Sequence, residues 1–147
     1  MTIRPATAAD VPAITALVEA AFARYVERIG VRPAPMDDDH AAYIARGEQW
    51  VMASDGRVVG AIVLIARDDH LFVENVALDP GLHGRGLGRR LLAFADDEAR
   101  RRGLPELRLY TNVAMTENLA IYPRLGYAET GRAQVGPYHR VSFAKRI

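Results

Sequence analysis

The chain contains no cysteine, which excludes disulfide bonds, a thiolate nucleophile and any zinc site built on cysteine. It also lacks a long hydrophobic run. The longest apolar segment, Val58 to Ala66, is far shorter than the ~20 residues that a membrane-spanning helix needs. The N-terminus does not have the charged-then-apolar layout of a signal peptide. These absences predict a cytoplasmic protein with no membrane partner.

An excess of charge of one sign is missing too. Lys and Arg together number 19, Asp and Glu 18, so the net charge is +1. A near-neutral chain is a poor non-specific binder of nucleic acid, and we expect no nucleic-acid partner. Half of the residues are apolar and 25% are charged, as in globular proteins. With no repeat or linker to divide it, residues 1–147 are expected to form one domain with its own core.

The stretch from Val76 to Arg90 is the most informative part of the chain. It predicts a buried strand, a turn and a glycine loop that opens directly into a helix. The loop alternates glycine with other residues and carries several arginines, namely Gly84, Gly86, Gly88, Arg85, Arg89 and Arg90. Glycines expose backbone N–H groups, and the start of a helix adds the positive end of its dipole. This combination suits a pyrophosphate group.

The spacing of the glycines limits the choice of ligand. A P-loop requires Gly-Lys-Ser/Thr, whereas Arg89 and Arg90 follow Gly88. In the dinucleotide-binding pattern G-x-G-x-x-G, the third glycine would fall at Arg89. Another phosphate ligand, such as a nucleotide, remains the alternative to the interpretation given below.

Periodicity and turn residues predict a mixed α/β protein of α+β character. Strands are expected at residues 2–6, 49–53, 57–67, 71–78, 106–111, 127–130 and 138–145. Helices are expected from Asp10 to about Tyr25 and over 37–46, 84–102 and 116–125. The order β-α-α-β-β-β-α-β-α-β-β predicts a central, mostly antiparallel sheet with helices on both faces.

Two motifs and this element order resemble the GCN5-related N-acetyltransferase (GNAT) family. Residues 83–88 match the family's Gln/Arg-x-x-Gly-x-Gly loop, except that His83 replaces Gln or Arg, and residues 122–127 match its Tyr-x-x-x-Gly-Phe/Tyr signature. The resemblance covers nearly the whole chain. It implies a GNAT-like domain that uses acetyl-CoA (coenzyme A) as co-substrate, without a metal. The implied reaction is transfer of the acetyl group to a primary amine of a small molecule or peptide, by direct attack in a ternary complex. A non-catalytic acyl-CoA-binding sensor or partner module is the alternative.

Glu74 is the candidate general base. Alternation along the strand places it on the same face as Val76, with Asn75 on the opposite face in a structural role. A glutamate inside a strand is disfavoured unless it has a purpose. Many family members carry an acidic base at this position, often acting through water. The alternative is that Glu74 only pairs with a nearby arginine.

Tyr122 is the candidate general acid. In the family this tyrosine lies near the coenzyme sulfur and can protonate the departing thiolate. A phenol with a pKa near 10 keeps its proton at neutral pH. The alternative is an amphipathic tyrosine that bridges core and surface.

The resemblance also implies the coenzyme contacts. The strand that holds Val76 should splay away from the following strand, leaving the N–H groups of Val76 and Leu78 free for the thioester carbonyl. The predicted coenzyme-binding residues are Val76, Ala77, Leu78, His83, Gly84, Arg85, Gly86, Leu87, Gly88, Arg89, Asn112, Asn118 and Tyr122. Many members have an asparagine seven residues before the tyrosine, where this chain has Met115. Asn118 either contacts the pantetheine arm or serves the first turn of its helix, and Asn112 is a second candidate.

The acceptor is expected to enter opposite the coenzyme. Its walls would come from the first two helices, the loop between them and the loop before the last strand. Tyr25, Met36, Tyr43 and Tyr138 are the predicted acceptor-binding residues, with Ile29, Pro35 and Asp39 beside them. Dimers are common among relatives, so a homodimer is a further expectation from the resemblance.

Overall fold

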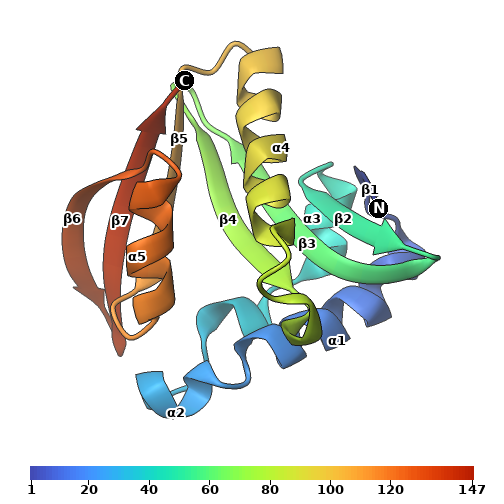
Figure 1. Ribbon diagram of the computed structural model, residues 1–147, viewed down its shortest axis with the longest axis horizontal. Coiled ribbons are helices and arrows are strands. Elements are labelled where there is room, and N and C mark those ends of the chain that lie inside the picture. The colour runs from blue at the N-terminus through green and yellow to red at the C-terminus, as the bar shows by residue number, and fades with distance from the viewer.

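The computed structural model describes residues 1–147, which form one seven-stranded sheet with helices on both faces (Figure 1). The strands are β1 (Thr2–Pro5), β2 (Gln49–Ser54), β3 (Arg57–Ala66), β4 (Leu71–Leu78), β5 (Glu106–Asn112), β6 (Ala128–Val135) and β7 (Tyr138–Arg146). The helices are α1 (Val11–Phe22), α2 (Tyr25–Ile29), α3 (His40–Ala45), α4 (Leu87–Arg101) and α5 (Thr116–Arg124). Short 3₁₀ turns cover Ala8–Asp10, Ala34–Asp37 and Pro80–Leu82.

The strand order is β1-β2-β3-β4-β5-β7-β6. Every neighbouring pair is antiparallel except β4 and β5, which run parallel. This confirms the predicted fold class. None of the helices combines the length and the apolar character that crossing a bilayer requires.

Each face of the sheet has its own apolar core. The larger core contains 17 buried residues and lies under α4, whose Leu91, Ala95 and Ala99 are fully buried, and α5 packs against the same core through Leu119 and Tyr122. The smaller core contains 9 buried residues and is formed mainly by α1. The apolar positions of α4 recur at helical spacing, so one side of this helix meets the sheet and the other meets solvent.

Two predicted helices differ from the observed ones near the N-terminal third. The first ends at Phe22, because the Val26 N–H bonds to the Ala23 carbonyl in a tight i to i−3 turn. A separate helix, α2, then begins at Tyr25 and ends at Gly30, which has φ +84°. The next helix, α3, begins after Asp39, whose carboxylate caps it by accepting the Ala42 N–H.

Strand β6 is longer than predicted. The expected strand stopped at residue 130, whereas β6 continues to Val135 and pairs with β7 along its length. Every residue of β6 is exposed, so the segment has no buried alternation that a sequence pattern could reveal. Its order comes from backbone hydrogen bonds to β7.

Strands β4 and β5 separate toward their carboxyl ends. They pair only at Leu71–Leu107 and Phe72–Arg108, although β4 has 8 residues and β5 has 7. Figure 1 shows them diverging below this point, with α4 and α5 following their ends. The predicted splay is therefore present, and it opens the sheet where the glycine loop lies.

Candidate active site

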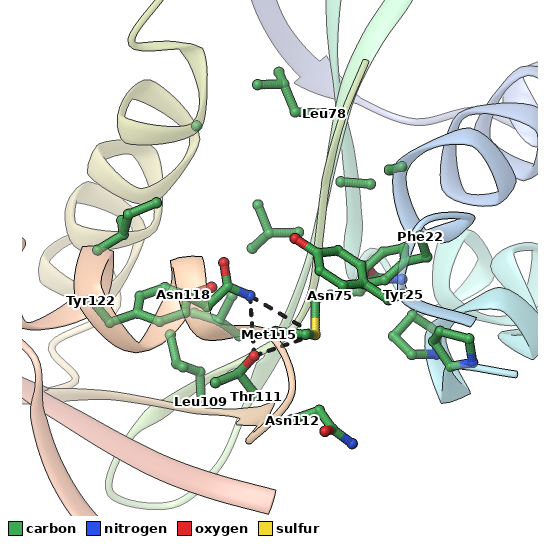
Figure 2. A pocket seen from close by; sticks show the side chains of 18 of the residues that line it. Phe22, Tyr25, Asn75, Leu78, Leu109, Thr111, Asn112, Met115, Asn118 and Tyr122 are labelled. Carbon is green, nitrogen blue, oxygen red and sulfur yellow. Dashed lines mark hydrogen bonds between the residues drawn. The ribbon is translucent and has the colours of Figure 1, made fainter. Parts of the chain in front are cut away.

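A cavity of about 410 Å³ fills the opening between the splayed strands (Figure 2). It runs from the start of α4, past the diverging halves of β4 and β5, to α1 and α2. Every residue predicted to contact the coenzyme lines this cavity, except Arg85. Both candidate catalytic residues, Glu74 and Tyr122, line it as well.

The glycine loop presents a row of free backbone donors. No hydrogen-bond acceptor meets the N–H groups of residues 84–89, and the first bond of the helix runs from the Arg90 N–H to the Gly86 carbonyl at 3.1 Å. Gly84 and Gly86 have φ values of +81° and +75°, a backbone region that favours glycine. No atom lies within 4 Å of where a Cβ would stand at Gly84, Gly86 or Gly88. The loop therefore leaves both donors and space for an anion.

The C-terminal half of β4 also has backbone N–H groups without a partner. The Asp79 N–H, directly after the strand, bonds to the Val59 carbonyl of β3 at 2.8 Å. In an antiparallel ladder alternate residues point their N–H groups to the same neighbour. The N–H groups of Val76 and Leu78 therefore point away from β3, into the gap that β5 has left.

A β-bulge at Glu74 changes which residues share a face of β4. Val63 pairs with Asn75 but Leu64 pairs with Val73, so Glu74 has no partner on β3. Residues beyond the bulge keep their alternation, with Val76 packed against the α4-side core and Ala77 in the α1-side core. The expectation that Glu74 shares the face of Val76 is therefore wrong, whereas Asn75 lies on the face opposite Val76, as predicted. Both side chains reach groups on the α1 side, next to Asp38.

Several charges act on the Glu74 carboxyl. Burial raises its pKa above the usual value, and the negative charge of Asp38 raises it further. Arg140 and Arg67 act in the opposite direction, but neither forms a hydrogen bond with Glu74. A carboxylate with a raised pKa in an apolar cavity is suited to accepting a proton.

Tyr122 projects from α5 into the cavity (Figure 2). Its ring packs against Tyr127 and Phe143, with ring centroids 5.5 Å and 5.6 Å away. Burial raises the pKa of its hydroxyl to about 12, so the group stays protonated at neutral pH. The hydroxyl is thus available as a donor.

Asn118 and Asn112 both line the cavity, and each forms a side-chain hydrogen bond within the protein. Asn118 donates from Nδ2 to Thr111 Oγ1 at 3.1 Å, a bond drawn in Figure 2, and so does not cap its helix. Asn112 accepts the Ala114 N–H at 2.9 Å and stabilises the turn after β5. Met115, which replaces the family's asparagine, is buried and belongs to the α1-side core.

Two hydrogen bonds connect segments of the chain that border the cavity near α2. Tyr25 donates from its hydroxyl to Glu117 Oε2 of α5 at 2.7 Å, and Tyr138 donates to the Arg32 carbonyl at 2.8 Å. The bonds from Tyr25 and then from Arg28 lower the pKa of Glu117 to about 2. Both tyrosines line the cavity, as predicted for acceptor-binding residues.

Two other predicted acceptor residues lie outside the cavity lining. Met36 packs against the α1-side core, and the Tyr43 ring lies beside the His40 ring and under the Arg46 guanidinium. Asp39, which stood beside them in the prediction, caps α3, and its neighbour Asp38 lines the cavity. The sequence predicted Asp39 at the acceptor site. Only the tertiary structure shows that, of the three consecutive aspartates, Asp38 is the one that lines the cavity.

Sequence reasoning did not identify Tyr110 and Arg140, which also line the cavity. The guanidinium of Arg140 lies over the Tyr110 ring, 4.2 Å from its centroid. These residues come from neighbouring strands, β5 and β7, and face the acceptor side. No local motif marks either of them.

Comparisons with known proteins agree with this geometry. A family model described as "Acetyltransferase (GNAT) family" matches residues 14–127. The chain is 37% identical over 90 residues to the IAA acetyltransferase of Azospirillum brasilense, which covers 60% of this chain and only 58% of that protein.

Solved structures resemble the whole fold. The PaiA N-acetyltransferase of Thermoplasma acidophilum, in complex with coenzyme A, has a TM-score of 0.84 at 15% identity and covers 99% of this chain and 98% of its own. The ribosomal-protein-S18-alanine N-acetyltransferase of Escherichia coli has a TM-score of 0.81 at 22% identity, with coverage of 99% and 93%. At these identities the likeness is one of fold.

Proposed function

This chain belongs to the acetyltransferase (GNAT) family, and from that premise we propose that it transfers an acetyl group from acetyl-CoA to a primary amine of a small molecule or peptide. The observation that carries the proposal is one continuous cavity. It joins the free N–H groups of residues 84–89 to Tyr122, to the unpaired edge of β4 and to Glu74.

The donor set of the loop fits the diphosphate of coenzyme A. Residues 84–89 offer unpaired N–H groups at the start of α4, and Gly84 and Gly86 leave the space beside them open. Arg89 lines the same end of the cavity and adds positive charge. The PaiA protein, whose solved structure contains coenzyme A, has the same fold.

Acetyl-CoA would supply a thioester whose carbonyl carbon accepts the amine nitrogen. We assign the N–H groups of Val76 and Leu78 to the carbonyl oxygen, because they point into the gap between β4 and β5. The new bond joins nitrogen to the acetyl carbon, and the bond that breaks joins that carbon to sulfur.

Two side chains would move the protons. An amine with a pKa near 10.4 is protonated at neutral pH, and Glu74 would accept its proton, directly or through water. Tyr122 would donate a proton to the sulfur as the thiolate leaves, and would regain one from the nitrogen, which loses its second proton as the amide forms. Its raised pKa keeps the hydroxyl protonated at neutral pH. Direct transfer in a ternary complex requires no acylated side chain, in agreement with the absence of cysteine.

The variants Glu74→Gln and Tyr122→Phe test this proposal. With acetyl-CoA and a panel of primary amines, turnover should fall about 10- to 10⁴-fold in each, because each loses one proton-transfer group. The affinity for coenzyme A, measured by calorimetry, should stay nearly unchanged, since the phosphate-binding donors are intact.

Tyr127→Phe is the matched control. Tyr127 is next to Tyr122, its hydroxyl is buried without a hydrogen-bond partner, and it does not line the cavity. Its turnover should equal that of the unaltered protein. If no amine raises turnover above thioester hydrolysis while coenzyme A still binds, the protein is an acyl-CoA-binding module and not an acetyltransferase.

A further inference from the structure

Asn75 has one buried atom that the fold leaves unsatisfied. The residue is 6% exposed, and its Oδ1 has no hydrogen-bond partner. The other end of the same amide, Nδ2, donates to Asp38 Oδ2 at 3.3 Å. Because a carboxylate only accepts, Asp38 fixes the orientation of the amide and leaves Oδ1 as the free acceptor. Asn75 lines the cavity on the side of β4 that faces Phe22 and Tyr25 (Figure 2).

Asp38 lies at the same place, where His40 acts on its charge but no cation is within salt-bridge distance. It is half-buried in the cavity wall, and it accepts a hydrogen bond from Asn75. Neither Asp38 nor Glu74 forms a salt bridge. The guanidinium of Arg140, which acts on the charge of Glu74 without bonding to it, stacks on the Tyr110 ring. Buried carboxylates are normally paired, so this pair is incomplete in the protein alone.

The acceptors gathered here match one chemical group. Asp38, Glu74 and Asn75 Oδ1 provide two carboxylates and one carbonyl, and a primary ammonium has three N–H donors. An anion would be repelled, and an alcohol has a single donor. The walls next to these acceptors are apolar and come from Phe22, Tyr25, Ile29, Pro33 and Pro35.

We propose that Asp38 and Asn75 bind the ammonium group of the acceptor, with Glu74 as the third partner, and that the acceptor is a primary amine carried on an apolar body. This inference rests on the proposed function, whose acceptor side it describes. The bulge in β4 is what makes the arrangement possible, because it turns two consecutive residues, Glu74 and Asn75, toward the same side as Asp38. The ammonium would be held next to Glu74, which then takes its proton.

A pair of probes that differ only in the charged group tests the inference. 2-Phenylethylamine and 2-phenylethanol are titrated by calorimetry into the protein, both free and saturated with coenzyme A, so that no turnover is required. The unaltered protein should bind the amine at least about tenfold more tightly than the alcohol, since hydrogen bonds to charged groups are the stronger ones.

The variant Asp38→Asn should lose most of this preference. Amine affinity should fall about 10- to 100-fold, and alcohol affinity should change by no more than about twofold. Asn75→Leu keeps the size of the side chain and removes Oδ1, and should lower amine affinity about 5- to 10-fold. In acetyl transfer to the same amine, both variants should raise KM more than they lower kcat.

Asp37→Asn is the matched control. Asp37 is the neighbouring aspartate, is exposed, pairs with Arg32 and does not line the cavity. Its probe affinities should equal those of the unaltered protein. Thermal melting and coenzyme A affinity report whether each variant is folded, and Asn75→Leu serves as the test if Asp38→Asn is not.

Two kinds of failure can be told apart. If the unaltered protein binds the two probes equally, or binds neither, or if a folded Asp38→Asn variant keeps the preference for the amine, the inference is wrong. If coenzyme A does not bind, or no amine is acetylated although the amine preference is present, the proposed function is wrong instead.

Discussion

At the scale of single residues, Asp10 connects the start of the chain to the first helix. Its carboxylate accepts two hydrogen bonds from the Arg4 guanidinium, at 2.8 Å and 3.0 Å, and one from the Thr7 N–H at 2.8 Å. The Arg4 bonds, and then the Thr7 N–H, outweigh burial and lower the pKa of Asp10 to about 2. The ionised form is thus stabilised in the folded protein.

Asp10→Asn should reduce the free energy of unfolding at pH 7 by about 1 kcal/mol, a modest value because solvent reaches the Arg4 side chain. The folded pKa of about 2 lies below the unfolded value of ~3.9, so this stabilisation is present above pH ~4 and is lost as the pH falls toward 2. Urea unfolding at several pH values should show a shallower acid dependence in the variant. Asp97→Asn, at a side chain that is 78% exposed, should match the unaltered protein at every pH.

At the scale of elements, helix α4 serves both the core and the coenzyme loop. Its apolar side is buried against the sheet, and its N-terminal end leaves the N–H groups of the loop unpaired. Both ends of the helix meet a glycine of positive φ, Gly86 at +75° and Gly103 at +70°. Only Gly86 lines the cavity.

Gly86→Glu should weaken coenzyme A binding about tenfold or more, since a carboxylate there would crowd and repel the diphosphate. Gly103→Glu makes the same change at nearly the same backbone angle, and no atom lies near either Cβ position. Both variants should lose about 1 kcal/mol of stability from the strained backbone. Calorimetry with coenzyme A should separate them. Equal affinities would mean that the phosphates bind elsewhere.

At the scale of the whole molecule, the sheet joins two apolar cores of unequal size. Leu91 of α4 is 0% exposed, in the larger core, and its Cδ1 lies 3.2 Å from where a Cβ would stand at Gly60 of β3. The helix therefore approaches the sheet as closely as a glycine permits. This contact ties the coenzyme loop to the centre of the fold.

Leu91→Ala should lower the free energy of unfolding by about 2–5 kcal/mol, because it leaves a cavity in the larger core. Chemical unfolding followed by both the fluorescence of Trp50, in the larger core, and circular dichroism should still give one transition, since both cores share the same sheet. Val135→Ala, at a residue that is 45% exposed on the edge strand, should change stability by less than about 0.5 kcal/mol. Separate transitions for the two probes would show that the cores unfold independently.

Much of this arrangement could be predicted from local patterns. The predicted limits of β4 match the structure to the residue. Helix α4 begins later than predicted, because the glycine loop replaces its first turn, and it ends at Arg101 instead of Arg102. The prediction was poorest for β6, which is exposed throughout and is ordered by its pairing with β7. It also failed at Glu74, because this unpaired residue interrupts the alternation of β4, so Glu74 does not share the face of Val76.

The sequence by itself determined the order of the elements, the glycine loop at the start of α4 and the family motifs, since each depends on residues close together in the chain. Tertiary structure alone decided that β4 and β5 separate, that Asp38 reaches Asn75 and Glu74 across the cavity, and that Tyr110 and Arg140 complete its wall. These contacts depend on the register of strand pairing and on the packing of distant segments. Periodicity within one segment carries no information about either.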